Sequence, residues 1–211
     1  MNFNNEFSCS ASRDELLRYL LVKSSPVMMK VKPAMLVRIS NCFKVRAFQA
    51  YEIFCSHQQA ILDTLALDYM IMKNNGKDMQ VLFYDPETLS NALATDEIKD
   101  FLKTMGYSDK PNVSEYLKEL RSRFTNQDFP HEIGVFLGYP LKDVKGFIND
   151  YDSGFSVSQG RWRIFGDASE SLLAMNRYRF AENFGKRIIE HYEDLSLCVI
   201  KIKSSIITQA I

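Results

Sequence analysis

Apolar and polar positions alternate over two stretches near the middle of the chain, and this alternation predicts a β-hairpin. The two stretches, 67–73 and 79–84, each repeat with the period of two that is typical of strands. Asn75 and Gly76 lie between them, and this dipeptide favours the positive φ values of a tight turn. Because both sides of each stretch are largely apolar, we expect the hairpin to lie inside a sheet covered on both faces.

Elsewhere, most apolar residues recur at helical spacing, and capping residues mark where helices begin. In the long helix expected near the C-terminal end, the apolar periodicity predicts that four residues face inward: Leu173, Phe180, Phe184 and Ile188. The pattern predicts helices over 13–23, 47–65, 141–148 and 169–192, shorter helices that begin at Asp85, Thr95 and Asn112, and strands over 34–39, 160–165 and 197–203.

Strands and helices are interspersed along the chain, which indicates an α/β or α+β fold. We expect a mixed sheet of about five strands, including the hairpin at 67–84, covered by helices. No repeat, low-complexity tract or linker interrupts the sequence, so residues 1–211 are expected to form a single domain.

The composition excludes several classes of protein. Hydrophobic residues make up 46% and charged residues 25% of the chain, as in ordinary globular proteins. The formal net charge is zero, so we expect no nucleic-acid partner. No apolar run approaches the roughly 20 residues that a membrane-spanning helix needs. The first residues lack a basic segment followed by an apolar one, so we expect a cytoplasmic protein.

The four cysteines and three histidines are scattered, without the spacing of metal ligands. We therefore expect no metal and no disulfide, with Cys55 and Cys198 packed as small apolar groups. Phosphate-binding and dinucleotide-binding glycine motifs are also absent from the sequence, so no cofactor is expected.

The charges are segregated along the sequence. Residues 16–51 contain seven basic residues and no acidic one, whereas residues 52–100 contain nine acidic residues and three basic ones. The favoured interpretation is that the two segments pair across the fold. The alternative is a cleft of one sign that concentrates an anionic ligand. The candidate ligand-binding residues of the basic segment are Lys23, Lys30, Lys32 and Arg38.

Two further candidates, Arg161 and Arg163, flank the single tryptophan, Trp162. On a strand, both arginines would lie on one face and Trp162 on the other. Such a pair can bind a phosphate or a carboxylate with two parallel hydrogen bonds. The alternative is an exposed polar face without a ligand.

Residues 129–140, FPHEIGVFLGYP, form the most unusual segment and supply the candidate catalytic residues His131, Glu132 and Tyr139. Histidine is a side chain suited to acid–base chemistry, and a carboxylate could orient His131. Gly134 and Gly138 would let a ligand approach the backbone. The alternative is a structural corner between two helices, with His131 as a cap or a packed ring.

This segment and its continuation, FPHEIGVFLGYPLKDVKGFI, resemble the signature of a bacterial family, domain of unknown function 3793. The stretches KPAML, VLFYDPETL and GRWRIFGD agree with the same pattern. The family pattern carries His-Cys-Ala-Pro where this chain has residues 23–26, Lys-Ser-Ser-Pro, and another cysteine where it has residues 158–160, Ser-Gln-Gly. The resemblance implies no activity, and these departures direct attention to the shared corner at 131–140.

These observations favour a cytoplasmic bacterial accessory protein that binds a small anionic ligand or a protein partner. One alternative is an enzyme that uses His131 as a general acid or base, assisted by Glu132 or Tyr139. Another is a structural or oligomeric module, which would present a contiguous exposed apolar patch.

Overall fold

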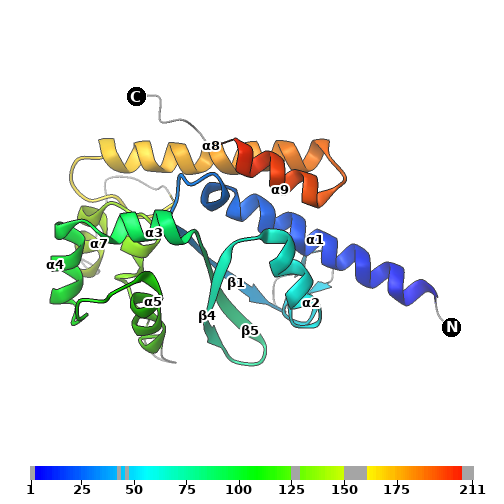
Figure 1. Cartoon of the computed structure of the whole chain (residues 1–211), viewed down its shortest axis with the longest axis horizontal. Helices are drawn as coiled ribbons and strands as arrows, with labels where there is room; N and C mark the ends of the chain where they lie inside the picture. Colours follow the sequence, from blue (N-terminus) through cyan, green and yellow to red (C-terminus); the bar gives the residue numbers. More distant parts are fainter. Residues whose placement is uncertain (1–2, 42–43, 46–47, 125–128, 150–160, 206–211) are drawn as a thin grey trace.

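The computed structural model describes residues 3–41, 44–45, 48–124, 129–149 and 161–205 (Figure 1). Its helices are α1 (Phe3–Met28), α2 (Ala50–Leu65), α3 (Pro86–Leu93), α4 (Asp96–Thr104), α5 (Val113–Ser122), α6 (Ile133–Phe136), α7 (Leu141–Asn149), α8 (Ser169–His191) and α9 (Leu195–Ser204). Its strands are β1 (Ala34–Ser40), β2 (Lys44–Val45), β3 (Phe48–Gln49), β4 (Asp68–Asn74) and β5 (Asp78–Tyr84).

The fold mixes helices with strands, as predicted, but the expected sheet of about five mixed strands is wrong. Within the described residues, the main sheet has three antiparallel strands in the order β1-β5-β4, and β2 and β3 form a separate two-stranded ribbon. Residues 197–203 belong to α9 instead of a strand, because Asp194 caps the helix by accepting hydrogen bonds from the backbone N–H of Ser196 and Leu197. Of the expected strand 160–165, the described residues 161–165 form bends and irregular backbone with an isolated bridge residue at Arg163.

The hairpin prediction is confirmed, with strands at 68–74 and 78–84 and a φ of +82° at Gly76. The φ of Asn75 is not positive. Asn75 instead shapes the turn through its side-chain oxygen, which accepts hydrogen bonds from the N–H groups of Lys77 and Asp78. Of the two hairpin strands, β5 is covered on both faces. In contrast, β4 is an edge strand with exposed positions.

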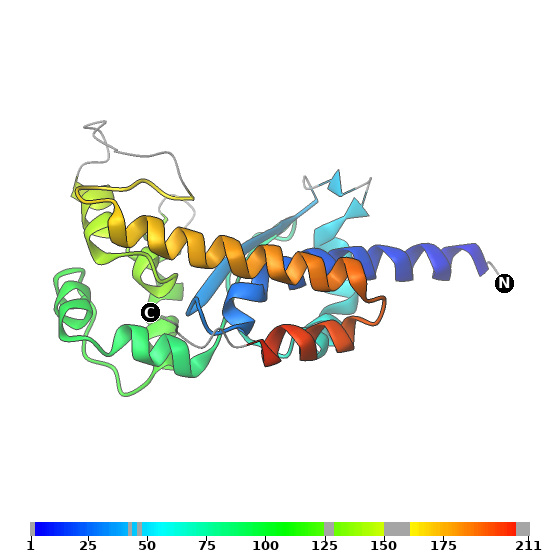
Figure 2. The same cartoon turned by 90° about the horizontal axis from the view of Figure 1, so that it is seen from above.

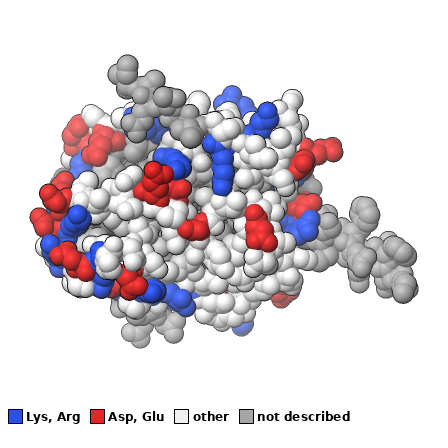
Figure 3. Space-filling view, in the orientation of Figure 1, with Lys and Arg blue, Asp and Glu red and all other residues white. Residues whose placement is uncertain are grey.

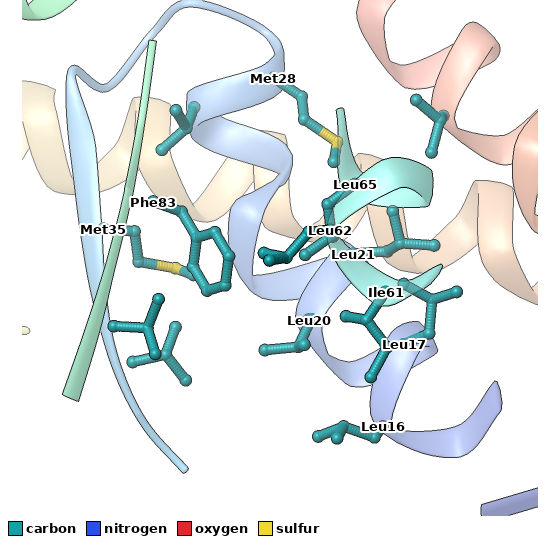
Figure 4. Close-up of a cluster of buried hydrophobic side chains, with 14 of the residues drawn as sticks. Leu16, Leu17, Leu20, Leu21, Met28, Met35, Ile61, Leu62, Leu65 and Phe83 are labelled. Carbon is teal, nitrogen blue, oxygen red and sulfur yellow. The ribbon is translucent and has the colours of Figure 1, made fainter. Parts of the chain in front are cut away.

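Two apolar cores lie on opposite faces of this sheet. On one face, Phe83 of β5 packs with leucines and an isoleucine of α1 and α2 (Figure 4). On the other face, Leu82 packs against residues such as Leu117 of α5 and Phe136 of α6. Successive residues of a strand point to opposite faces, so the neighbours Leu82 and Phe83 tie both cores to one strand.

Helix α8 runs alongside α1, and α9 lies beside α8 (Figure 2). The helices α1 and α8 approach so closely that a β-carbon at Gly185 would overlap the hydroxyl of Ser25. Of the residues of α8 expected to face inward, Phe184 and Ile188 pack partly buried against the core, whereas Leu173 and Phe180 are exposed. The buried positions of α8 are instead mostly smaller or polar: Ser171, Met175, Tyr178, Ala181, Gly185 and Ile189.

Two cations of the basic segment, Lys30 and Arg38, pair in space with the acidic segment. Lys30 binds Glu87 at 2.5 Å, and Arg38 binds Asp78 at 2.8 Å, so cations of the basic segment meet carboxylates of the acidic one. On the face drawn in Figure 3, basic and acidic side chains are accordingly intermingled. No described helix is both long enough and apolar enough to cross a membrane. Cys198 is buried as expected, whereas Cys55 is exposed.

The turn at Gly76 gives a direct test of the hairpin. Gly76→Val should lower the free energy of unfolding by about 1 kcal/mol or more, because a β-branched residue resists a positive φ. Nothing lies within 4 Å of a β-carbon built at this position, so the cost is conformational and not steric crowding. Gly76→Asn is the control, since asparagine tolerates this region, and urea denaturation measures both. Equal losses in the two variants would contradict this explanation.

Candidate functional site

A cavity of about 430 Å³ opens beside the segment 129–140. Four aromatic side chains line it: Phe129, Tyr139, Phe147 and Trp162. His131 and Arg163 also contribute to its walls. We call this space the corner cavity. It brings together three of the residues singled out in the sequence, namely His131, Tyr139 and Arg163.

The corner itself is a short turn of helix between two breaks. The backbone N–H of Leu137 donates to the carbonyl oxygen of Ile133, and Gly138 then leaves the helix with a φ of +72°. A β-carbon at Gly138 would lie 2.6 Å from Pro33 and 2.8 Å from the hydroxyl of Tyr178. Gly138 therefore permits close packing of the protein against itself, and not the approach of a ligand.

The ring of His131 lies at the rim of the corner cavity. It is exposed and meets the ring of Phe147 edge-on, with the centroids 5.0 Å apart. The ring of Phe129 lies on another side at 6.0 Å. These contacts place His131 where a molecule entering the cavity would touch it.

Glu132 lies apart from His131, in a buried polar cluster. Its carboxylate accepts a hydrogen bond of 3.1 Å from the hydroxyl of Tyr107, and Arg123 lies 3.5 Å away. Arg123 is itself fixed by Glu119 and by the carbonyl oxygen of Met105. Burial and the nearby Glu132 charge raise the pKa of Tyr107, which keeps its hydroxyl protonated as a donor. This geometry gives Glu132 a structural contact and does not bring it to the cavity.

Asp143 contributes the most densely hydrogen-bonded side chain near the cavity. Its buried carboxylate accepts hydrogen bonds from Lys142 Nζ, Trp162 Nε1, the backbone N–H of Phe165 and Ser171 Oγ, at 2.7, 2.8, 2.9 and 2.6 Å. Burial alone would raise the pKa of Asp143, but these hydrogen bonds outweigh it and hold that pKa below its ordinary value. The sequence analysis missed Asp143, because an acid in the first turn of a helix ordinarily faces solvent.

Through this hydrogen bond, Asp143 fixes the aromatic wall of the cavity. Trp162 donates its indole N–H to Asp143 and stacks its ring on Tyr139, with 4.3 Å between centroids and 18° between planes. Such a stacked pair holds both rings in one orientation. The cavity wall is therefore formed before any ligand enters.

The two arginines that flank Trp162 have different roles. Arg161 makes two hydrogen bonds of 2.6 Å to the carboxylate of Glu182. Arg163 lines the cavity, with its guanidinium 5.7 Å from the ring centroid of Phe165, and its side chain makes no hydrogen bond or ion pair with the described residues. Its charge is thus uncommitted.

A second group of cations lies on another side of Tyr139. We call Lys23, Lys32 and Arg161 the basic cluster, since Lys23 lies 3.9 Å from Glu182, the carboxylate that Arg161 binds. The ammonium of Lys32 lies 5.5 Å from the ring centroid of Tyr139 and 5.2 Å from that of Tyr178.

The other two cations expected from the sequence lie elsewhere. Lys30 binds Glu87 and lies 4.0 Å from Asp85, whereas Arg38 binds Asp78 on the sheet. Neither belongs to the corner cavity or to the basic cluster.

Comparison with known proteins identifies the family. A model of the family described as Protein of unknown function (DUF3793) matches residues 20–198. The chain belongs to this family. Neither the curated proteins nor the solved structures contain a match.

Of the two segments that differ from the resemblance noted in the sequence, the structure describes residues 23–26. At the end of α1, the buried hydroxyls of Ser24 and Ser25 donate to the carbonyl oxygens of Leu20 and Leu21. The other departure, at 158–160, lies outside the described residues. Across the described part of the chain, no group of three or more His, Cys, Asp or Glu side chains could hold a metal ion.

Asp143→Asn should lower the free energy of unfolding at pH 7 by about 2–4 kcal/mol, because it leaves buried donors and Lys142 without their charged acceptor. Asp167→Asn, at an exposed aspartate in the next segment, should change it by no more than about 0.5 kcal/mol. Urea denaturation followed by the fluorescence of Trp162, the single tryptophan, measures both.

The difference in the free energy of unfolding between wild type and Asp143→Asn should depend on pH. The depressed pKa of Asp143 stabilises the folded state above the unfolded aspartate pKa of about 4, and this contribution is lost as pH falls through the folded value. The gap between wild type and Asp143→Asn should therefore narrow in acid. A gap that stays constant from pH 7 down to about pH 2 would contradict this role.

Proposed function

We propose that this protein binds a small organic anion with a flat apolar body in the corner cavity. The observation that carries the proposal is the uncommitted guanidinium of Arg163 on the wall of a cavity lined with aromatic rings. The cytoplasmic location expected from the sequence is retained as part of the proposal.

The size and lining of the cavity suit a small molecule. Pockets that hold such ligands have volumes of roughly 300–1,000 Å³ and mostly apolar walls with a few polar groups. The corner cavity, at about 430 Å³, lies in this range. Trp162, Tyr139 and Phe147 offer ring faces and edges against which a planar group packs favourably. Because Asp143 holds Trp162 in place, little conformational freedom is lost on binding.

The charges around the cavity favour an anion. Asp143 is the one carboxylate among the described lining residues, and all its oxygen atoms already accept hydrogen bonds, including one from Lys142. Arg163 remains available, and a guanidinium binds a carboxylate with two parallel hydrogen bonds. His131 at the rim adds a second polar group that can contact the ligand.

The geometry supports binding over catalysis at this corner. In the enzymatic alternative expected from the sequence, Glu132 would orient His131 as a general base. Glu132 faces Tyr107 and Arg123 instead. Burial raises the pKa of Tyr139, so this phenol stays protonated at neutral pH and is a poor base.

The test uses two probes of the same shape, 2-naphthoate and its neutral amide, 2-naphthamide. The acid should quench or shift the fluorescence of Trp162 and bind more tightly than the amide in calorimetric titrations. Arg163→Gln should weaken binding of the acid about tenfold or more, because it removes a charged hydrogen-bond donor. Arg38→Gln, which removes an exposed cation outside the cavity, should leave the affinity unchanged.

His131→Ala separates binding from folding in the same experiment. Because this ring is exposed, its loss should change the melting temperature little while weakening 2-naphthoate. A loss of about 1–3 kcal/mol of stability with intact binding would assign His131 a structural role. Equal affinity for the acid and the amide would overturn the proposal of an anion site.

A further inference from the structure

The backbone around Lys32 is fixed from both sides. After α1, Lys30 adopts a φ of +56°, and the N–H groups of Val31 and Lys32 both donate to the carbonyl oxygen of Pro26. Pro33 then packs against Gly138 of the corner. This closed helix end holds the Cα of Lys32 at a defined point, from which its side chain reaches Tyr139 and Tyr178.

The ammonium group of Lys32 lacks the partners that a lysine usually has. It makes no hydrogen bond or ion pair with the described residues, and its recorded contacts are the two tyrosine rings. Its Nζ is not among the fully buried atoms that lack a partner, and the residue is partly exposed. This nitrogen is therefore not sealed from solvent.

The charges that face Lys32 come from three parts of the fold. Lys23 of α1 and Arg161 of the segment after α7 carry its own sign, and Glu182 of α8 is the carboxylate nearby. Both oxygens of Glu182 accept hydrogen bonds from Arg161, so much of its charge is already balanced. The two tyrosines, on the corner and on α8, keep their protons, because burial raises the pKa of each.

These surroundings favour the neutral amine. Burial first, and then the charge of Arg161, lower the pKa of Lys32 from 10.5 to about 8. At pH 7, about a tenth of the Lys32 side chains are then neutral, against about one in three thousand for an ordinary lysine. Only the neutral amine has a lone pair to donate, so this nitrogen is the more nucleophilic one.

We propose that Lys32 is a nucleophilic amine that forms an imine with small 2-oxo acids, whose carboxylate Arg161 and Lys23 attract. This activity belongs to the basic cluster and goes beyond anion binding in the corner cavity. The charges favour this substrate class, because a keto group next to a carboxylate brings a negative charge to a cluster in which three cations, Lys23, Lys32 and Arg161, share the carboxylate of Glu182.

The chemistry balances without an oxidant or a reductant. The lone pair of Nζ attacks the carbonyl carbon, and the electron pair of the C=O bond moves to oxygen, which takes a proton to give a carbinolamine. The nitrogen lone pair then forms the C=N bond as the hydroxyl leaves with a proton. One water is released, the two protons lost by nitrogen end on that water, and the step is reversible.

The experiment traps the imine on the full-length protein. Glyoxylate, the smallest 2-oxo acid, is added with cyanoborohydride, which reduces an imine to a stable secondary amine, and peptide mapping locates the label. Lys32 should be labelled at pH 7 at least about tenfold faster than Lys30, whose hydrogen bond to Glu87 raises its pKa. The rate at Lys32 should rise with pH to a midpoint near the pKa of about 8.

Two variants and a second aldehyde make the result decisive. Arg161→Gln removes a cation and frees Glu182, so the midpoint at Lys32 should move to higher pH and labelling at pH 7 should slow. Arg38→Gln should leave the midpoint at Lys32 and the labelling rate at pH 7 unchanged. Acetaldehyde, which carries no charge, should prefer Lys32 over Lys30 by a smaller factor than glyoxylate does, because only the difference in pKa between the two lysines remains. Labelling of Lys32 no faster than Lys30, or a midpoint near 10.5 as for an ordinary lysine, would overturn the proposal.

Discussion

The carboxylate of Asp143 organises the part of the molecule where both candidate sites lie. It is buried at the start of α7 and accepts hydrogen bonds from the segment that contains Trp162 and Phe165 and from Ser171 on α8. A buried charge is tolerated only when hydrogen bonds replace the water it has lost. The need to satisfy this one charge therefore joins three stretches of chain and orients Trp162.

The stacked pair of Trp162 and Tyr139 carries this constraint to the two sites. Both rings line the corner cavity, and Tyr139 also lies beside the ammonium of Lys32. Arg161 and Arg163, the neighbours of Trp162 in sequence, are held on either side of the same anchor. One turns to Glu182 in the basic cluster, and the other lines the cavity. The irregular backbone of this segment makes the division possible, since a regular strand would put both arginines on one face.

The sequence predicts those elements whose signals are local. The hairpin combines alternation with a turn at Gly76, and both signals lie within a few residues. Residues 197–203 fit a strand by alternation, but Cys198, Val199 and Ile202 also share one helical face, and the cap at Asp194 favours the helix. The role of Asp143 could not be predicted, because Phe165 and Ser171 are more than twenty residues away in sequence. The sequence identifies the candidate cations by residue type. Only the folded structure shows that Lys30 pairs with Glu87, whereas Lys32 lies beside two tyrosine rings.

The surroundings of Lys32 have a free-energy consequence that bears on the reaction proposed for the basic cluster. The pKa of Lys32 in the folded state, about 8, lies below its unfolded value of 10.5, so the folded protein binds fewer protons between these values. Below pH 8 the charged ammonium therefore lowers the free energy of unfolding, and this loss is recovered as the pH rises towards 10.5. A bound anion can supply the missing negative charge at neutral pH, and any molecule that binds only the folded state stabilises it. The burial and the like charges that make the Lys32 ammonium unfavourable would therefore also favour capture of the anionic substrate proposed for the basic cluster.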